Sequence, residues 1–322
     1  MVIVSESILS WKQMCGDLCG ISQPTACGAI HTITEVFAGR LRDHIRLPST
    51  HQEAIDAMTW FFDYGGFPGV VAAVDGTHIL IANPGGNSSE VYRNVFSINV
   101  QVAAGINLKI VDIVARRPGS FNDATIFEGS GLHMAFEEGR IEGHLLGDSE
   151  YPCLPFLFTP LPPQNARTEP EIRYNLHHEK SLNAAKHLFG LWKRRFRCLK
   201  SGLEYKPYFV VAIICATAVL YNISREVNEP MPDDEFPWVE EVHQPLSPSP
   251  DHANRVDHHF REDFISCLSL AVMLNPPVRT YRITSPLEVL LDKKQLFSVQ
   301  ADAVKRDYLD FVLKQEVIDY LK

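Results

Sequence analysis

Residues 70–78 decide the fold of this protein and read VVAAVDGTH. Five consecutive apolar residues followed by Asp75 predict a buried strand that ends at the aspartate. Short apolar runs predict two further strands over 96–104 and 110–115, and the Gly-containing segment between them predicts a hairpin. The middle of the chain is therefore expected to form a β-sheet.

Segments with helical character surround these strands. Residues 1–68 have apolar side chains at helical spacing, 182–199 predict a helix with a basic carboxyl-terminal half, and 208–227 predict a buried helix. The apolar run over 208–221 is too short to cross a bilayer, so we expect no membrane span. Strands enclosed by helices predict an α/β fold.

A short turn divides the helical start of the chain. Gly20 and Ile21 precede Ser22, which is a good N-cap, and Pro24 suits the first turn of the helix that follows. A helix, a Gly-containing turn and a second helix over residues 11–37 have the form of a helix-turn-helix. An ordinary pair of antiparallel helices explains the same pattern, and the pattern alone favours it.

The composition narrows the class of protein. The chain has 322 residues and a net charge of −9, which by itself argues against nucleic acid as a partner. The acidity is concentrated in residues 226–322, which carry 10 basic and 18 acidic side chains, so the first two thirds can still hold basic patches. Seven scattered Cys without a Cys-x-x-Cys pair argue against a disulfide scaffold or a Cys-rich zinc site and favour an intracellular protein.

Two aspartates follow predicted strands. Asp75 closes the strand described above, and Asp148 closes a short strand that begins at His144. Active groups gather at the carboxyl ends of strands in α/β sheets, and two neighbouring carboxylates repel each other unless a cation lies between them. Oxygen ligands suit Mg²⁺ or Mn²⁺, and a two-metal site cleaves phosphodiesters by activating water. For either aspartate alone, a turn or helix cap is the better explanation, and Asp75-Gly76 is a common turn pair.

Other charged residues also have two interpretations. Asp123 lies in a Pro/Gly/Ser turn before a predicted helix, so the residues alone predict a structural N-cap. The run 193–200 holds five cations, and on a helix these form a stripe that can track phosphates. A solvated helix end whose cations complement the macrodipole explains the run equally well. The four candidate DNA contacts are Lys193, Arg194, Arg195 and Arg197.

Six sequence blocks follow one another in the middle of the chain: VAAVDGTHI (71–79), RPGSFNDATIF (117–127), LLGDSEYP (145–152), YN-x-x-H (174–178), FGLWKRRFRCL (189–199) and AVLYNI (218–223). In this order they resemble the blocks of Harbinger transposases and of the DDE-type nucleases derived from them. The resemblance covers about residues 65–225. It implies a ribonuclease-H-like mixed sheet flanked by helices, preceded by a helix-turn-helix-like segment, and a DNA-cleaving site that uses Mg²⁺ or Mn²⁺. It also implies DNA and a separate DNA-binding protein as partners, and a location in the nucleus, with the cytoplasm as a second location.

The resemblance assigns roles to individual residues. Asp75 matches the first catalytic aspartate, Asp148 the second, and Asp123 an acid near the site and a metal ligand. The family's final catalytic residue is a Glu, and Lys186 stands at that position. We expect its ammonium to point into the pocket of Asp75 and Asp148 and to pair with them. Glu179 is the nearby acid considered as a replacement, but it lies two helical turns away, about 10 Å at 1.5 Å per residue.

Two functions follow from these observations. The first is a metal-dependent nuclease, supported by the two aspartates and the ordered blocks. The second is a non-catalytic, domesticated DNA-binding or partner-binding protein, supported by Lys186 and the acidic carboxyl-terminal part. The predicted organisation is a helical segment (1–68), a nuclease domain (69–227), an acidic Pro-rich linker (228–258) and a helical tail (259–322).

Overall fold

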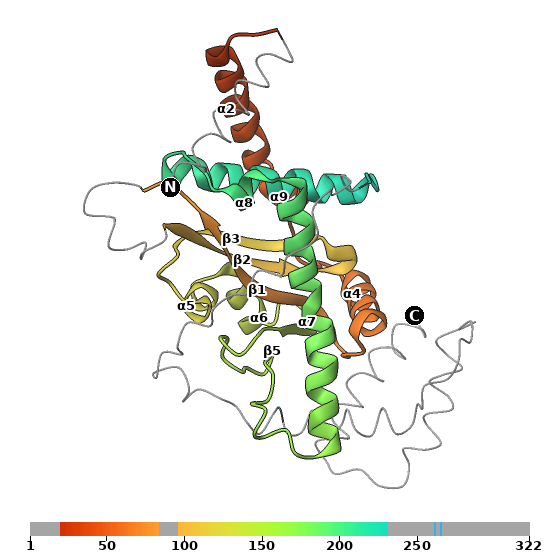
Figure 1. Ribbon diagram of the computed structural model, residues 1–322. Helices are drawn as coiled ribbons and strands as arrows, with labels where there is room; N and C mark the ends of the chain where they lie inside the picture. Colours follow the sequence, from red (N-terminus) through yellow and green to blue (C-terminus); the bar gives the residue numbers. More distant parts are fainter. Residues whose placement is uncertain (1–19, 84–95, 231–260, 262–264, 266–322) are drawn as a thin grey trace. The chain divides into compact units, whose positions relative to one another are not determined.

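A computed structural model of the chain describes residues 20–83, 96–230, 261 and 265 (Figure 1). The chain forms two compact units, Met1–Arg261 and Glu262–Lys322. Every helix and strand described below lies in the first unit. The first helix of the predicted helix-turn-helix lies outside the described residues. Of the predicted linker and tail, the structure describes only residues 228–230, 261 and 265. The predicted domain boundaries stay predictions.

A five-stranded mixed sheet forms the centre of the first unit, in the order β3-β2-β1-β4-β5. Its strands are β1 (Val70–Leu80), β2 (Ser97–Ala104), β3 (Ile110–Pro118), β4 (His144–Leu146) and β5 (Leu157–Phe158). The pairs β1–β2 and β2–β3 are antiparallel, which agrees with the predicted hairpin, whereas β1–β4 and β4–β5 are parallel. The central strand β1 therefore joins an antiparallel half of the sheet to a parallel half.

Helices flank this sheet. In Figure 1 the long helix α7 runs across the sheet toward α9. Helices α4 and α7 pack against β1, α5 against β2, and α9 against β3. A buried apolar cluster that includes Ala57, Val74, Phe127 and Leu132 fixes α4, α5 and α6 to β1. The described helices are α2 (Gln23–Gly39), α3 (Leu41–His44), α4 (His51–Gly65), α5 (Asp123–Glu128), α6 (Gly131–Glu137), α7 (Glu169–Arg195), α8 (Cys198–Ser201), α9 (Pro207–Glu226) and the 3₁₀ turn η2 (Ile106–Leu108).

Strand β1 extends beyond its predicted end. Antiparallel pairing with β2 continues as far as Leu80, opposite Ser97, whereas parallel pairing with β4 stops at Ala73 and Leu146. The prediction that the strand ends at Asp75 is therefore wrong, and so is the turn considered there, because hydrogen bonds to β2 keep the chain extended. Asp75 lies instead just beyond the point where the parallel partner of β1 stops.

The first described helix begins as the sequence predicts. Ser22 is the N-cap of α2 and accepts a hydrogen bond from the Thr25 main chain, and Pro24 lies in the first turn. Helix α7 begins earlier than the predicted residue 182, because Glu171 accepts a hydrogen bond from the Thr168 N–H and closes a new first turn.

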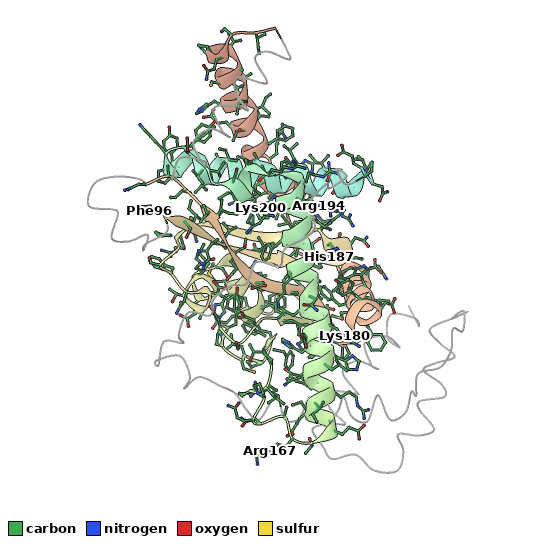
Figure 2. The ribbon with its side chains drawn as sticks, in the orientation of Figure 1. Phe96, Arg167, Lys180, His187, Arg194 and Lys200 are labelled. Atoms are coloured by element: carbon green, nitrogen blue, oxygen red, sulfur yellow. The ribbon has the colours of Figure 1, made fainter. Side chains whose placement is uncertain are left out.

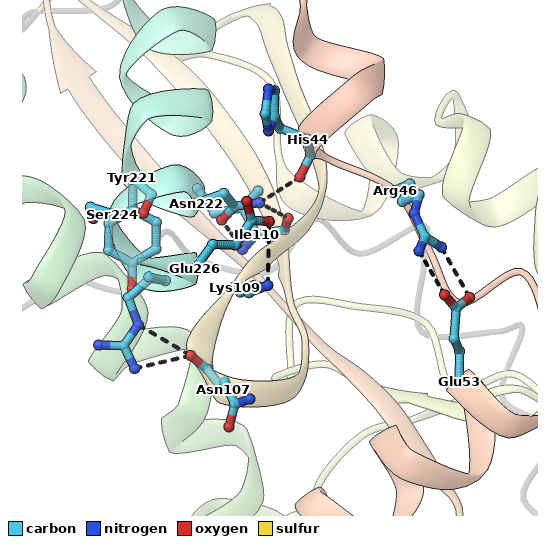
Figure 3. Close-up of polar contacts among 11 residues, drawn as sticks. His44, Arg46, Glu53, Asn107, Lys109, Ile110, Tyr221, Asn222, Ser224 and Glu226 are labelled. Atoms are coloured by element: carbon cyan, nitrogen blue, oxygen red, sulfur yellow. Dashed lines mark hydrogen bonds and ion pairs between the residues drawn. The ribbon is translucent and has the colours of Figure 1, made fainter. Parts of the chain in front are cut away.

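Helix α9 is a core helix. It is long and apolar enough to cross a membrane, but 61% of its apolar stretch is buried inside the fold. Asn222 accepts a hydrogen bond from the Ile110 N–H at 2.8 Å and donates to the carbonyls of Ile110 and His44 at 2.7 and 2.9 Å (Figure 3). Tyr221 donates to the Leu108 carbonyl at 2.9 Å. These bonds join α9 to the start of β3 and to the end of α3.

Candidate active site

The two predicted aspartates lie at matching positions on neighbouring strands. Ala73 of β1 pairs with Leu146 of β4 in a parallel register, and Asp75 and Asp148 each follow that pair by two residues. Residues two apart on a strand share one face of a sheet. Burial raises the pKa of Asp75 to about 8, and the charges of Asp148 and Asp123 add to that effect. The structure therefore brings the three acids into one electrostatic cluster.

Asp123 is part of this cluster and is not an N-cap. Asn122 caps α5 instead, because its Oδ1 accepts a hydrogen bond from the Thr125 N–H at 3.0 Å. Asp123 is the first residue of α5 and is only 8% exposed. Its Oδ1 accepts a hydrogen bond from Nδ2 of Asn99 on β2 at 2.7 Å. The N-cap interpretation is therefore wrong, and the carboxylate faces the sheet.

Sequence reasoning missed two members of the cluster, Glu150 and Tyr151. The Glu150 N–H donates to Oδ1 of Asp148 at 2.9 Å, and burial, Asp148 and Asp123 raise the pKa of its carboxyl to about 7. The Tyr151 phenol is buried, and all four acids add to the effect of burial in raising its pKa. Glu150 could have been found from its position two residues after Asp148. Glu179, the acid considered before, is exposed on α7.

Lys186 has the smallest influence of the groups that shift the pKa of Asp75. Its side chain is exposed on α7. Burial, Asp148 and Asp123 raise the pKa of Asp75, and the Lys186 charge opposes them as the smallest influence. The net shift is upward, which is the reverse of what a dominant ammonium would produce. At Asp75 the Lys186 charge acts in the expected direction but is outweighed, and the pairing of Lys186 with the two aspartates stays a prediction.

The predicted cationic stripe does not form a simple solvated face. Lys193 is 7% exposed, and its Nζ donates to the His78 carbonyl at 3.4 Å. Arg195 forms an ion pair with Glu229 at 2.8 Å, beyond the end of α9. Arg194 is half-buried and Arg197 is exposed. Figure 2 shows Lys180, His187 and Arg194 in order along α7.

The donor atoms of the cluster fit a hard divalent cation. Its carboxylates supply oxygen ligands alone, which Mg²⁺ and Mn²⁺ prefer. Their mutual repulsion, expressed in the raised pKa values of Asp75 and Glu150, is what a bound cation relieves. Among the described residues, no three acids, His or Cys lie close enough to hold one ion as they stand. The chemistry of the donor atoms, all carboxylate oxygens, thus suits such a metal.

Comparisons with known proteins give the site a context. Residues 74–222 match the family model described as DDE superfamily endonuclease. The chain is 32% identical over 223 residues to the human protein "Putative nuclease HARBI1", a match covering 67% of this chain and 63% of that protein. The mouse protein of the same name is 31% identical over 248 residues, covering 73% and 70%. The Arabidopsis thaliana "Protein ALP1-like" is 27% identical over 241 residues, covering 68% and 58%. No solved structure matches the chain.

Proposed function

This chain belongs to the DDE-type, Harbinger transposase-derived nucleases, and on that premise we propose that it is a divalent-metal-dependent nuclease hydrolysing DNA phosphodiesters. The observation that carries the proposal is the matched position of Asp75 and Asp148 beyond the β1–β4 pair, with Asp123 acting on the same carboxyl group. The human relative is matched over less than two thirds of its length, so the activity and the partners of this chain are proposals.

We also propose that the fold is ribonuclease-H-like. Support comes from the mixed sheet, in which three antiparallel strands in sequence are followed by two parallel strands on the other side of β1. Further support is the position of the acids beside the central strand, with α7 packed against that strand. Such an arrangement collects the acids at one edge of the sheet, where a phosphodiester can reach them.

Asp75, Asp148 and Asp123 are the residues that we propose would hold Mg²⁺ or Mn²⁺. A divalent cation bound there supplies Lewis acidity and a more acidic water, which are the effects that phosphodiester hydrolysis needs. Asp75 must first lose its proton, because burial and the neighbouring Asp148 and Asp123 raise its pKa to about 8. Metal affinity is therefore expected to increase as the pH rises toward that value.

We assign to Glu150 the role of accepting the proton of the attacking water. Its main-chain N–H is bonded to Asp148, which keeps the residue beside the cluster. Its side chain is exposed, so substrate and water can reach it. Partial burial of the carboxyl, Asp148 and Asp123 together raise the pKa of Glu150 to about 7. A general base works best when its pKa lies near the working pH.

A second candidate is a non-catalytic DNA-binding or partner-binding protein. Lys186 at the expected Glu position favours it, because an ammonium beside the acids disfavours a second cation. Under either function we propose DNA as the ligand and a separate DNA-binding protein as partner. Of the four predicted contacts, Arg194 and Arg197 are the candidates, because Lys193 is buried and Arg195 is paired with Glu229. We propose the nucleus, and secondarily the cytoplasm, as its location.

Cleavage of duplex DNA and Mn²⁺ binding by calorimetry distinguish the two functions. A nuclease is expected to cleave with Mg²⁺ or Mn²⁺, and Asp75→Asn should lower the rate at least about 100-fold, the scale of losing one preorganised electrostatic contact to the transition state. Lys186→Glu should strengthen Mn²⁺ binding and raise the rate. Lys180→Glu is the matched control, because Lys180 is also exposed on α7.

The contrary result is equally clear. A native protein that neither binds Mn²⁺ nor cleaves, while Lys186→Glu does both, would establish the non-catalytic function. Cleavage by the native protein at the rate of Lys186→Glu would mean that Lys186 is not at the catalytic position.

A further inference from the structure

Asn99 makes two hydrogen bonds that fix the position of Asp123. The residue lies on β2, is 2% exposed, and is buried next to the loop that precedes α5. Its Nδ2 donates to Oδ1 of Asp123 at 2.7 Å and to the Phe121 carbonyl at 3.0 Å. One amide group thus holds both the main chain of the loop, at Phe121, and the carboxylate of Asp123 at the start of α5.

Gly76 leaves the space that this carboxylate occupies. A Cβ atom built on Gly76 would lie 2.2 Å from Oδ2 of Asp123 and 2.6 Å from its Cγ. These distances are far shorter than van der Waals contact, so any side chain at position 76 must displace the carboxylate. Two features therefore fix the position of the Asp123 carboxylate. The Asn99 amide on β2 donates a hydrogen bond to it, and Gly76 on β1 leaves the space that it fills.

A second buried amide lies in the same region. Gln101 is fully buried and faces Gly76 across the β1–β2 pair. Both of its polar atoms lack a hydrogen-bond partner among the described residues. Since buried polar groups are almost always paired, an unpaired amide opposite Gly76 is a group for which a polar ligand or an ordered water is expected.

A helix cap does not explain this arrangement, because Asn122 already caps α5. Burying a carboxylate is costly unless another group compensates. We infer that Asn99 is a positioning residue, which acts through Asp123 by holding its carboxylate above Gly76 so that it can serve the metal beside Asp75. This inference rests on the proposed function, which places a divalent cation in the cluster. Asn99 itself touches neither the metal nor the substrate.

Mn²⁺ affinity measured by calorimetry tests the inference. Loss of an outer-shell partner typically weakens metal binding 10- to 100-fold, so we expect the dissociation constant of Asn99→Leu to rise at least about 10-fold. In an Asp123→Ala background the same substitution should change it less than about 2-fold, because nothing remains to be positioned. Asn175→Leu is the control, since Asn175 bonds the main chain of Leu161 at both ends of its amide. That variant should leave Mn²⁺ affinity unchanged.

Gly76→Ala tests the position of the Asp123 carboxylate independently of Asn99. It should weaken Mn²⁺ binding in the native background and be tolerated in Asp123→Ala, where the displaced carboxylate is gone. Equal effects of Asn99→Leu with and without the Asp123 carboxylate would overturn the inference.

Metal-free urea unfolding of the same variants separates this inference from the proposed function. If the native protein binds no Mn²⁺, the proposed function fails, and the unfolding cycle alone decides whether Asn99 and Asp123 are coupled. If the changes in urea midpoint of Asn99→Leu and Asp123→Ala do not add up in the double variant, the two residues are coupled and the positioning role is supported. If the two changes add up, the positioning role is overturned.

Discussion

At the scale of single residues, the carboxyl group of Asp75 links stability to pH. Burial and the charges of Asp148 and Asp123 raise its pKa from 3.8 to about 8. Between these two values the folded protein binds a proton that the unfolded chain has released. The contribution of Asp75 to the free energy of unfolding is therefore fully favourable below about pH 4 and is lost as the pH rises toward 8.

Asp75→Asn is expected to remove the decrease in the free energy of unfolding between pH 4 and pH 8, because the Asn amide does not ionise. At pH 8 and without metal, the variant should be more stable than the native protein by at least about 1 kcal/mol, since one pKa unit corresponds to 1.36 kcal/mol. At pH 5 the two proteins should differ less. Urea unfolding at both pH values measures the difference, and a native protein that equals the variant at pH 8 would contradict the prediction.

Asp123 shows why single residues are the hardest scale to predict from sequence. Its Pro/Gly/Ser surroundings correctly predict a turn before a helix, but the neighbouring Asn122 takes the cap. The contact that gives Asp123 its role comes from Asn99, which lies 24 positions away in the chain. No local pattern contains that contact, because it depends on how α5 packs against β2.

At the scale of elements, Asn222 joins three segments. It bonds both main-chain groups of Ile110 and the carbonyl of His44. Asn222→Ala leaves the buried Ile110 groups without partners, at about 1–3 kcal/mol for each. We expect the free energy of unfolding to fall by about 2–5 kcal/mol. Asn183→Ala, on the exposed side of α7, should change it by less than about 0.5 kcal/mol, and a similar loss in both variants would refute the assignment.

The elements themselves were partly predictable. The apolar start of β1 and the cap at Ser22 agree with the sequence because both depend on neighbouring residues. The extension of β1 to Leu80 could not be predicted from the local sequence, because it follows from pairing with β2 across polar residues. The early start of α7 has a local signal in the sequence, the pair of Thr168 and Glu171 at N-cap and N3 spacing.

At the scale of the whole molecule, some basic side chains near the end of α7 are bonded to the rest of the fold, and others are exposed to solvent. Lys193 and Arg195 are engaged with the fold through His78 and Glu229, whereas Arg197 and Lys200 are exposed. Replacing the two exposed residues by Ala should lower the salt dependence of DNA binding by about 0.9 per lost phosphate contact. Titration of duplex DNA at several salt concentrations measures this slope.

Arg195→Ala is the comparison for this prediction. It should mainly lower thermal stability, because it breaks the ion pair with Glu229. If the salt dependence of DNA binding changes for Arg195→Ala but not for the variant that lacks Arg197 and Lys200, the assignment of DNA contact to the two exposed residues is contradicted.

The two-sided pairing of β1 has a consequence for how the chain folds. Its antiparallel partner β2 follows closely in sequence, whereas Ala73 pairs with Leu146 only after the intervening 72 residues have been brought together. Contacts between residues so distant in sequence form slowly, because the entropy of closing the loop is lost before the contact is gained. The β1–β2–β3 meander is therefore expected to form first and the β1–β4 pair late. Asp75 and Asp148 meet only at that late step, so a partly folded chain carries no assembled acid cluster.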